Sequence, residues 1–301
     1  MPTERLPDFN ILFANLKPHL WEMVTDSVRF VRHALEAAGA RVRIGTNQLD
    51  TSGAINLFFD RFYEDPQLPR QLKAAGVRFG LICTEVIDAD GTWNYGAEND
   101  PPGTFAAFEI AAKSADFVWC QLAESVPAVR ALNPRTLHLP FGYLKAMETL
   151  ANPPWGVRDI DCLMVGLPSS RRDDIAAEVT ARNLRLCYPG LPVPLAVRDG
   201  LMERARLQLS VQKTVRHRIV SVSRICHSVI NRVPLLLESD AIDSPYARYC
   251  LMAAHNTVAS TAARHLAETD LEAWAKERYD AFKQEMPMAE AMARVLKETV
   301  A

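Results

Sequence analysis

Short apolar runs alternate with longer helical patterns along this chain, and that alternation constrains the fold more than any other feature of the sequence. Residues 8–15, DFNILFAN, form an apolar run of strand length. Residues 20–38 then repeat apolar side chains on one helical face, and Gly39 stands where a helix C-terminus is usually capped. Strand alternating with helix predicts a parallel, doubly wound sheet.

The alternation is interrupted once by a proline-rich segment and then starts again. Tandem prolines in LANPPWG, residues 150–156, cannot continue a helix or a central strand, so this segment is expected to be a linker. Beyond it, DCLMVGL (residues 161–167) is strand-like and SSRRDDIAAEVTARN (residues 169–183) is helical. We therefore expect an α/β protein of two Rossmann-like domains, residues 1–149 and 150–301, with a ligand cleft between them.

Composition narrows the class of protein. A net charge of -2 and a pI near 6.4 argue against a general nucleic-acid binder. No apolar run reaches the ~18 residues of a membrane span, and MPTERLPDFN has no apolar signal core, so we expect a cytoplasmic protein without a transmembrane segment. The six cysteines are scattered and form no CxxC pair, which indicates reduced, buried thiols and no zinc site.

A first candidate anion site follows the strand at the start of the second half. In MVGLPSSRRDD, residues 164–174, a strand ends, the chain turns at Gly166 and a helix begins. The pair Ser170 and Asp173 resembles a capping box. Because a helix N-terminus offers free N–H groups and positive potential, it favours a phosphate there, and Arg171 and Arg172 would add charge. An ordinary solvated first turn is the alternative.

A second candidate lies in residues 204–237, which contain no acid before Glu238. Within it, His217, Ser221, Arg224 and Ser228 recur at helical spacing and predict a polar stripe beside an apolar one. Such a helix suits the wall of a cleft, and Glu238 follows at the carboxyl end of the next strand. The alternative is that Arg224 pairs with a distant acid and that Glu238 is a surface residue.

The segment SRICHSVINRVPLLLES, residues 223–239, resembles the helix–strand unit of GT-B glycosyltransferases, especially the CgeB-like group. LICTEVID, ADFVWCQLAESVPAVRALNPRTLHLPFGY and DIDCLMVGLPSSRRDDI resemble further segments of that group, in the same order along the chain. The resemblance covers most of the chain, although each motif alone is degenerate. It also suggests that the last helix crosses back onto the first domain.

The resemblance implies transfer of a sugar from a nucleotide donor held by the second domain to an unknown acceptor on the first. It further implies that Arg224 faces the diphosphate and Glu238 the ribose. A catalytic base is expected at a strand end of the first domain, where Glu85 is the first candidate and His19 the second. We expect no metal or other cofactor.

One feature departs from that family. Many retaining GT-B enzymes carry two glutamates eight residues apart, and the acid-free run excludes that motif here. A nucleotide-sugar epimerase of the same fold and a catalytically silent sugar-nucleotide-binding or scaffold protein therefore stay open as alternatives.

Overall fold

The computed structural model describes residues 6–13, 18–59, 65, 67–88, 92–93, 103–191, 193–215, 221–238 and 244–300, without the side chains of residues 13 and 18–23. The chain divides into two compact units. The N-terminal unit combines Met1–Phe141 with Met288–Ala301, and the C-terminal unit is Gly142–Pro287. The division therefore falls before the proline-rich segment expected as the linker, and the last helix belongs to the N-terminal unit.

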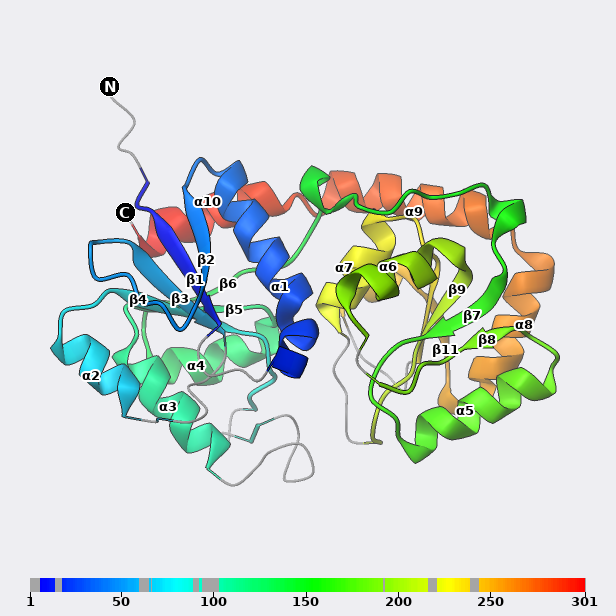
Figure 1. Cartoon of the computed structure of the whole chain (residues 1–301), viewed down its shortest axis with the longest axis horizontal. Helices are drawn as coiled ribbons and strands as arrows, with labels where there is room; N and C mark the ends of the chain where they lie inside the picture. The colour runs from blue at the N-terminus through cyan, green and yellow to red at the C-terminus, as the bar shows by residue number, and fades with distance from the viewer. Residues whose placement is uncertain are drawn as a thin grey trace. The chain divides into compact units, whose positions relative to one another are not determined.

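The N-terminal unit is built on a six-stranded parallel sheet in the order β2-β1-β3-β4-β5-β6. Its strands are β1 (Phe9–Phe13), β2 (Val42–Thr46), β3 (Ile55–Phe59), β4 (Phe79–Cys83), β5 (Phe117–Cys120) and β6 (Thr136–His138). Its helices are α1 (Pro18–Ala37), α2 (Leu68–Ala74), α3 (Thr104–Ser114), α4 (Val126–Leu132) and α10 (Met288–Thr299). Figure 1 shows α2, α3 and α4 on one face of the sheet, and α1 with α10 on the other.

Residues 20–38 form the predicted amphipathic helix. Val28, Val31 and Leu35 are buried, as their shared helical face requires. Gly39 follows the helix with φ +92°, and Ala40 N–H donates back to Leu35 O over 3.0 Å. This left-handed residue closes the helix in the way that the sequence indicates.

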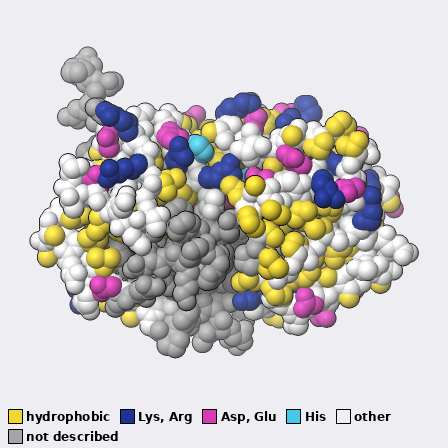
Figure 2. Space-filling model, in the orientation of Figure 1, with side chains coloured by type: hydrophobic (Ala, Val, Ile, Leu, Met, Phe, Trp, Pro, Cys, Tyr) yellow, Lys and Arg dark blue, Asp and Glu magenta, His cyan; other side chains and the backbone are white. Residues whose placement is uncertain are grey.

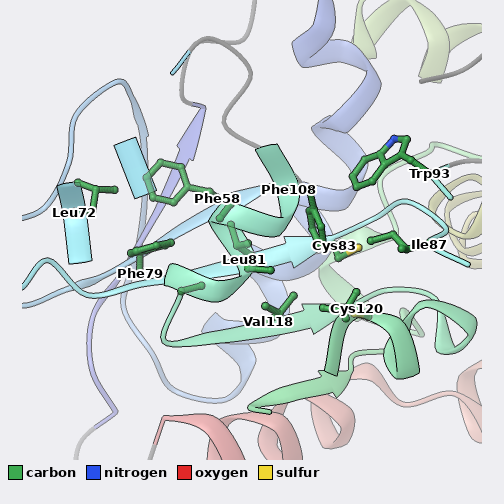
Figure 3. Packing of buried hydrophobic residues seen from close by; sticks show 14 of the residues in the cluster. Phe58, Leu72, Phe79, Leu81, Cys83, Ile87, Trp93, Phe108, Val118 and Cys120 are labelled. Carbon is green, nitrogen blue, oxygen red and sulfur yellow. The ribbon is translucent and has the colours of Figure 1, made fainter. Parts of the chain in front are cut away.

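Aromatic side chains fill the core beneath α2, α3 and α4 (Figure 3). Phe58 meets Phe79 edge-on with ring centroids 5.9 Å apart, and Trp93 lies 5.2 Å from Phe108. On the other face, Phe117 packs directly over Gly80. A Cβ atom at that glycine would lie 2.3 Å from the Phe117 ring, so the close approach of ring and strand requires glycine.

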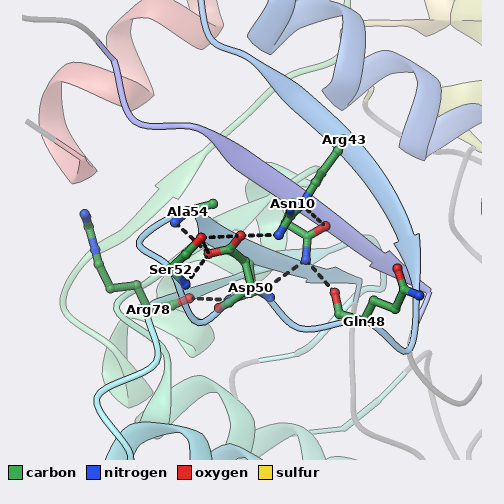
Figure 4. Close-up of polar contacts among 8 residues, drawn as sticks. Asn10, Arg43, Gln48, Asp50, Ser52, Ala54 and Arg78 are labelled. Atoms are coloured by element: carbon green, nitrogen blue, oxygen red, sulfur yellow. Dashed lines mark hydrogen bonds and ion pairs between the residues drawn. The ribbon is translucent and has the colours of Figure 1, made fainter.

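A buried polar network replaces a crossover helix between β2 and β3. Residues 47–54 pass from the end of β2 to the start of β3, on opposite sides of β1. Asn10 on β1 donates to Gln48 O and to Asn56 Oδ1, each over 2.9 Å (Figure 4). Asn56 in turn donates to Asp50 O and accepts from Asp50 N–H. The amides thereby satisfy the backbone of a segment that has no helical hydrogen bonds of its own.

The C-terminal unit holds a five-stranded parallel sheet in the order β11-β10-β9-β7-β8. Its strands are β7 (Ile160–Met164), β8 (Leu186–Cys187), β9 (Ala205–Ser210), β10 (Leu235–Glu238) and β11 (Leu251–Ala253). Its helices are α5 (Ser170–Ala181), α6 (Leu195–Arg204), α7 (Val222–Ile230), α8 (Val258–Glu268) and α9 (Leu271–Glu285). Figure 1 shows α5 and α8 on one face and α6, α7 and α9 on the other.

The two ends of the C-terminal unit lie side by side. Tyr143 N–H donates to Met286 O over 2.7 Å, and Tyr143 forms an isolated parallel bridge with Pro287. The hydroxyl groups of Tyr143 and Tyr279 both donate to Glu148 over 2.6 Å. The segment that enters this unit is therefore tied to the segment that leaves it.

All six cysteines are free thiols, and all but the half-buried Cys187 are buried, which confirms the prediction made from their scatter. Burial raises the pKa of Cys162 to about 12, so this thiol stays protonated at neutral pH.

Candidate ligand-binding site

The predicted donor-binding residues that the structure describes lie after β7, after β9 and at the end of β10, all at one edge of the sheet. In a parallel sheet the carboxyl ends of all strands lie at the same edge, where open α/β sheets bind ligands. Gly166 and the start of α5 follow β7, Ser221 and Arg224 follow β9, and Glu238 ends β10. Sequence motifs as far apart as Arg171 and Glu238 therefore meet.

The turn between β7 and α5 is shaped by Gly166 and Arg172. Gly166 adopts φ +147°, and a Cβ there would lie 2.7 Å from Nη1 of Arg172. Arg172 is buried and donates from Nε to Val211 O over 2.9 Å and from Nη1 to Leu167 O. This guanidinium joins the turn to the end of β9, and burial lowers its pKa. In this structure Arg172 thus donates its hydrogen bonds to backbone carbonyl groups.

The cap of α5 is one residue earlier than predicted. Ser169 occupies the N-cap position, with extended backbone angles, and its hydroxyl accepts from Arg172 N–H over 3.4 Å. Ser170 is the first helical residue, so the predicted pairing of Ser170 with Asp173 as a capping box is wrong. The shift leaves the basic pair Arg171 and Arg172 in the first turn of the helix.

Glu238 is completely buried, and both of its oxygens are engaged. Arg171 Nη2 donates to Oε1, and the N–H of Gln212 donates to Oε2 over 2.8 Å. The alternative, that Glu238 is a surface residue, is therefore wrong. The ion pair with Arg171 joins the two candidate anion sites, which lie far apart in the sequence.

A histidine that the sequence did not indicate completes this group. His255 follows β11 and lies at the same edge of the sheet, with Nδ1 3.2 Å from Oε1 of Glu238. Its Nδ1 atom is buried but lacks the geometry of a hydrogen bond. His255 carries no motif, and only its position after an apolar run could have indicated it. Arg171, Glu238, His255 and the N–H of Gln212 are called the Glu238 cluster below.

Helix α7 is buried along most of its length, and the predicted polar stripe is divided: Ser228 is buried, whereas Ser221 and Arg224 are half-buried. Arg224 Nη1 donates to Ser210 Oγ over 3.1 Å, and Ser228 donates to Gln208 over 2.6 Å. Both contacts face β9. Ser221 precedes the helix at the N-cap position, without a side-chain capping bond. His217 lies outside the described residues.

The described basic residues of the acid-free run do not all gather in one place. Arg204 pairs with Asp159 over 2.6 Å, and Arg206 lies 3.5 Å from Asp161, all beside the starts of β7 and β9. Among the described basic residues of the run, Lys213 and Arg224 come after the carboxyl end of β9. The basic residues of one sequence segment are thus divided between two opposite edges of the sheet.

The two predicted catalytic residues belong to the N-terminal unit. Glu85 follows β4 and is half-buried, and its backbone carbonyl accepts from Ser125 Oγ over 2.9 Å. His19 lies in the first turn of α1, with a side chain outside the described part of the structure. Both positions lie at or just after carboxyl ends of strands, at β4 and β1.

The described part of the structure shows neither a clustered set of metal ligands nor a membrane-spanning helix. Within the described ranges, no three His, Cys, Asp or Glu side chains are grouped as metal ligands would be. None of the described helices is both long enough and apolar enough to cross a bilayer. On the face drawn in Figure 2, basic and acidic side chains are interspersed over the described surface.

Solved structures of the same fold are numerous, although they are very distant in sequence. A structure titled trehalose-6-phosphate synthase OtsA aligns with a TM-score of 0.59 and 10% identity, over 97% of this chain and 98% of that one. A UDP-N-acetylglucosamine 2-epimerase aligns with a TM-score of 0.57 and 10% identity, over 97% and 95%. The N-terminal domain of Candida albicans trehalose-6-phosphate phosphatase aligns with a TM-score of 0.57 and 10% identity, over 100% and 99%.

These similarities establish the fold, which is the two-domain, Rossmann-like GT-B type. The structural neighbours include GT-B glycosyltransferases and UDP-N-acetylglucosamine 2-epimerases. No protein-family profile and no curated protein matches the sequence.

Proposed function

We propose that the C-terminal unit binds a nucleotide-diphosphate sugar and that the chain transfers the sugar to an acceptor. The observation that carries the proposal is the convergence of Arg171, Arg224 and Glu238, from separate motifs, at the carboxyl edge of one Rossmann-like sheet. A diphosphate gains negative charge as it leaves, and prearranged cations stabilise that charge. The motifs shared with the CgeB-like group support placing the chain there.

The proposed roles divide between the two units. Arg171, Arg224 and the N-terminal end of α5 bind the diphosphate, while Arg172 fixes the turn that precedes them. Glu85 is the proposed base that takes a proton from the acceptor hydroxyl, with His19 as the second candidate. The reaction needs no divalent metal, and neither a nucleic acid nor a membrane takes part.

A nucleotide-sugar epimerase is the second candidate function. Its support is the TM-score of 0.57 to a UDP-N-acetylglucosamine 2-epimerase over nearly the whole of both chains. The two reactions leave different products. A transferase or donor hydrolase separates the sugar from its nucleotide, whereas an epimerase returns an altered sugar that is still attached.

Calorimetry with a panel of nucleoside diphosphates and nucleotide sugars tests the binding step. We expect at least one of them to bind more tightly than its bare nucleoside, because the phosphates meet arginine. Incubation of the donor that binds, with and without a chelator, then tests the chemistry. Sugar release that persists with the chelator supports the proposal, and binding without any change in the donor indicates a silent binder. A panel in which no nucleotide binds would reject the proposal.

A further inference from the structure

The Glu238 carboxylate is the most completely enclosed charge at the carboxyl edge. Its exposed fraction is 0%, while the partner side chains Arg171 and His255 are 16% and 27% exposed. Within the described part of the chain, Arg171, His255 and the N–H of Gln212 surround it, and both of these side chains are more exposed than the carboxylate. The group nearest to solvent in this cluster is therefore basic, and the acid lies beneath it.

We propose that Glu238 does not touch the ligand and instead positions Arg171 and His255, which together bind the diphosphate. This inference rests on the proposed function and deepens it, because it assigns His255 to the phosphate subsite. It also replaces the ribose contact that the family resemblance implies for Glu238.

Steric and hydrogen-bonding arguments both support this assignment. A carboxylate has about four lone-pair sites, and partners from α5, β11 and the end of β9 already surround this one. A ribose hydroxyl could reach it only by displacing Arg171 or His255. Displacing Arg171 would leave a buried carboxylate with less compensation, which is costly. A phosphate instead meets the partly exposed side of the two basic groups without breaking the ion pair.

Whether Glu238→Gln weakens or strengthens pyrophosphate binding shows whether Glu238 positions the basic groups or only repels the anion. Glu238→Gln removes a negative charge from beneath an anion site, so electrostatics alone would strengthen the binding of inorganic pyrophosphate. Loss of positioning predicts the opposite, a weakening of roughly ten-fold, since charge-assisted hydrogen bonds to phosphate require oriented donors. Affinity for the bare nucleoside should stay unchanged, whereas a ribose contact predicts that it falls.

A double-mutant cycle tests whether Glu238 acts through Arg171. Arg171→Gln should weaken pyrophosphate binding by roughly ten-fold, and adding Glu238→Gln to that variant should change little further. Independent effects that simply add would overturn the positioning role. Thermal melts of each variant identify losses that come only from unfolding.

His255→Ala gives a test that does not depend on Glu238 variants folding. We expect several-fold weaker pyrophosphate binding with an unchanged affinity for the nucleoside. His265→Ala is the matched control, because His265 lies on α8 and contacts Thr269 Oγ1 over 2.9 Å, within its own helix region. Equal effects of the two histidine variants would overturn the inference.

The inference and the proposed function fail in different ways. If the wild-type protein binds no nucleoside diphosphate, the proposed function fails. If it binds one, but Glu238→Gln binds pyrophosphate as well as wild type or better, only the inference fails.

Discussion

Two buried polar networks, one in each unit, differ in whether their charges and hydrogen bonds are all satisfied within the network; the N-terminal one is called the closed network below. The N-terminal network joins Asn10, Arg43, Asp50, Ser52 and Asn56 at the amino ends of β1 and β3. There Asn56 makes two donated and two accepted hydrogen bonds, which is its full capacity. Its one acid, Asp50, is matched by one base, Arg43.

The Glu238 cluster lies at the carboxyl edge of its own sheet, and its described side chains are not matched one acid to one base. One carboxylate faces Arg171 and His255, and Arg224 of α7 donates to Ser210 at the end of the neighbouring strand β9. A network whose charges and hydrogen bonds are all used internally can only stabilise the fold. A network whose described members include more basic than acidic side chains suits the anion binding that we propose for it. The comparison therefore predicts different outcomes for mutations in the two networks.

The largest expected effect is on stability, from Asn56→Ala in the closed network. The change leaves Asp50 N–H, one N–H of the Asn10 amide and the Asp50 carbonyl without this partner, while Arg78 O keeps its bond from the backbone N–H of residue 56. Unsatisfied buried groups cost about 1–3 kcal/mol each. We expect a loss of about 3 kcal/mol in the free energy of unfolding, measured by urea denaturation. Nucleotide affinity of the folded protein should be unchanged. A measurable loss of affinity would show that the network is not purely structural.

A smaller effect, on affinity rather than stability, is expected from Arg224→Ala. Loss of a charge-assisted hydrogen bond to phosphate weakens binding of a nucleoside diphosphate by about 1.5–3 kcal/mol, roughly ten-fold or more. The nucleoside should lose less, since it has no phosphate. Calorimetry with both ligands, beside a thermal melt, separates the roles. A lower melting temperature with unchanged affinity would make Arg224 structural, like Asn56.

The smallest effect is expected from titrating the closed network with acid. Burial raises the pKa of Asp50, but hydrogen bonds from the N–H groups of Ala54 and Ser52, and the nearby Arg43, outweigh it and lower the pKa. Because the folded-state pKa lies below the unfolded value, Asp50 stabilises the fold above the unfolded pKa. That contribution is lost as the pH falls through the folded pKa.

In the wild-type protein the urea concentration at the unfolding midpoint should fall below about pH 4, where a normal aspartate becomes protonated. In Asp50→Asn this fall should be smaller. Asp159→Asn is a suitable comparison, because its carboxylate is exposed and paired with Arg204 at the surface. Equal flattening by the two variants would mean that the closed network has no special share in the acid response.

The sequence predicted most of the sheets and helices, and the failures have identifiable physical causes. Helix α6 was not predicted because Pro194 directly precedes it, Gly200 interrupts it, and its apolar residues follow no helical stripe. Strand β11 was not predicted because three residues within a continuous apolar run do not show a period of two. A strong helical period of apolar residues, as in α1, was enough by itself to predict the helix.

The candidate site was predicted less completely than the fold. Arg171, Arg224 and Glu238 could be placed at one edge because each follows a predicted strand in a parallel sheet. The contact between Arg171 and Glu238 could not be predicted, since it depends on the order of strands in the sheet. The division of the basic run was missed for the same reason, because Asp159 and Asp161 reach Arg204 and Arg206 only after β7 pairs with β9.

The hydrogen bond between Tyr143 and Met286 has a consequence for how the chain is divided into domains. Topologically, the C-terminal unit is a guest inserted into a host, because α10 returns to the N-terminal unit after it. Its entry and exit are adjacent, as in proteins that tolerate domain insertion and circular permutation. A fragment that contains the whole C-terminal unit is thus Gly142–Pro287, not everything after the prolines. The N-terminal unit is complete only if α10 is kept with it.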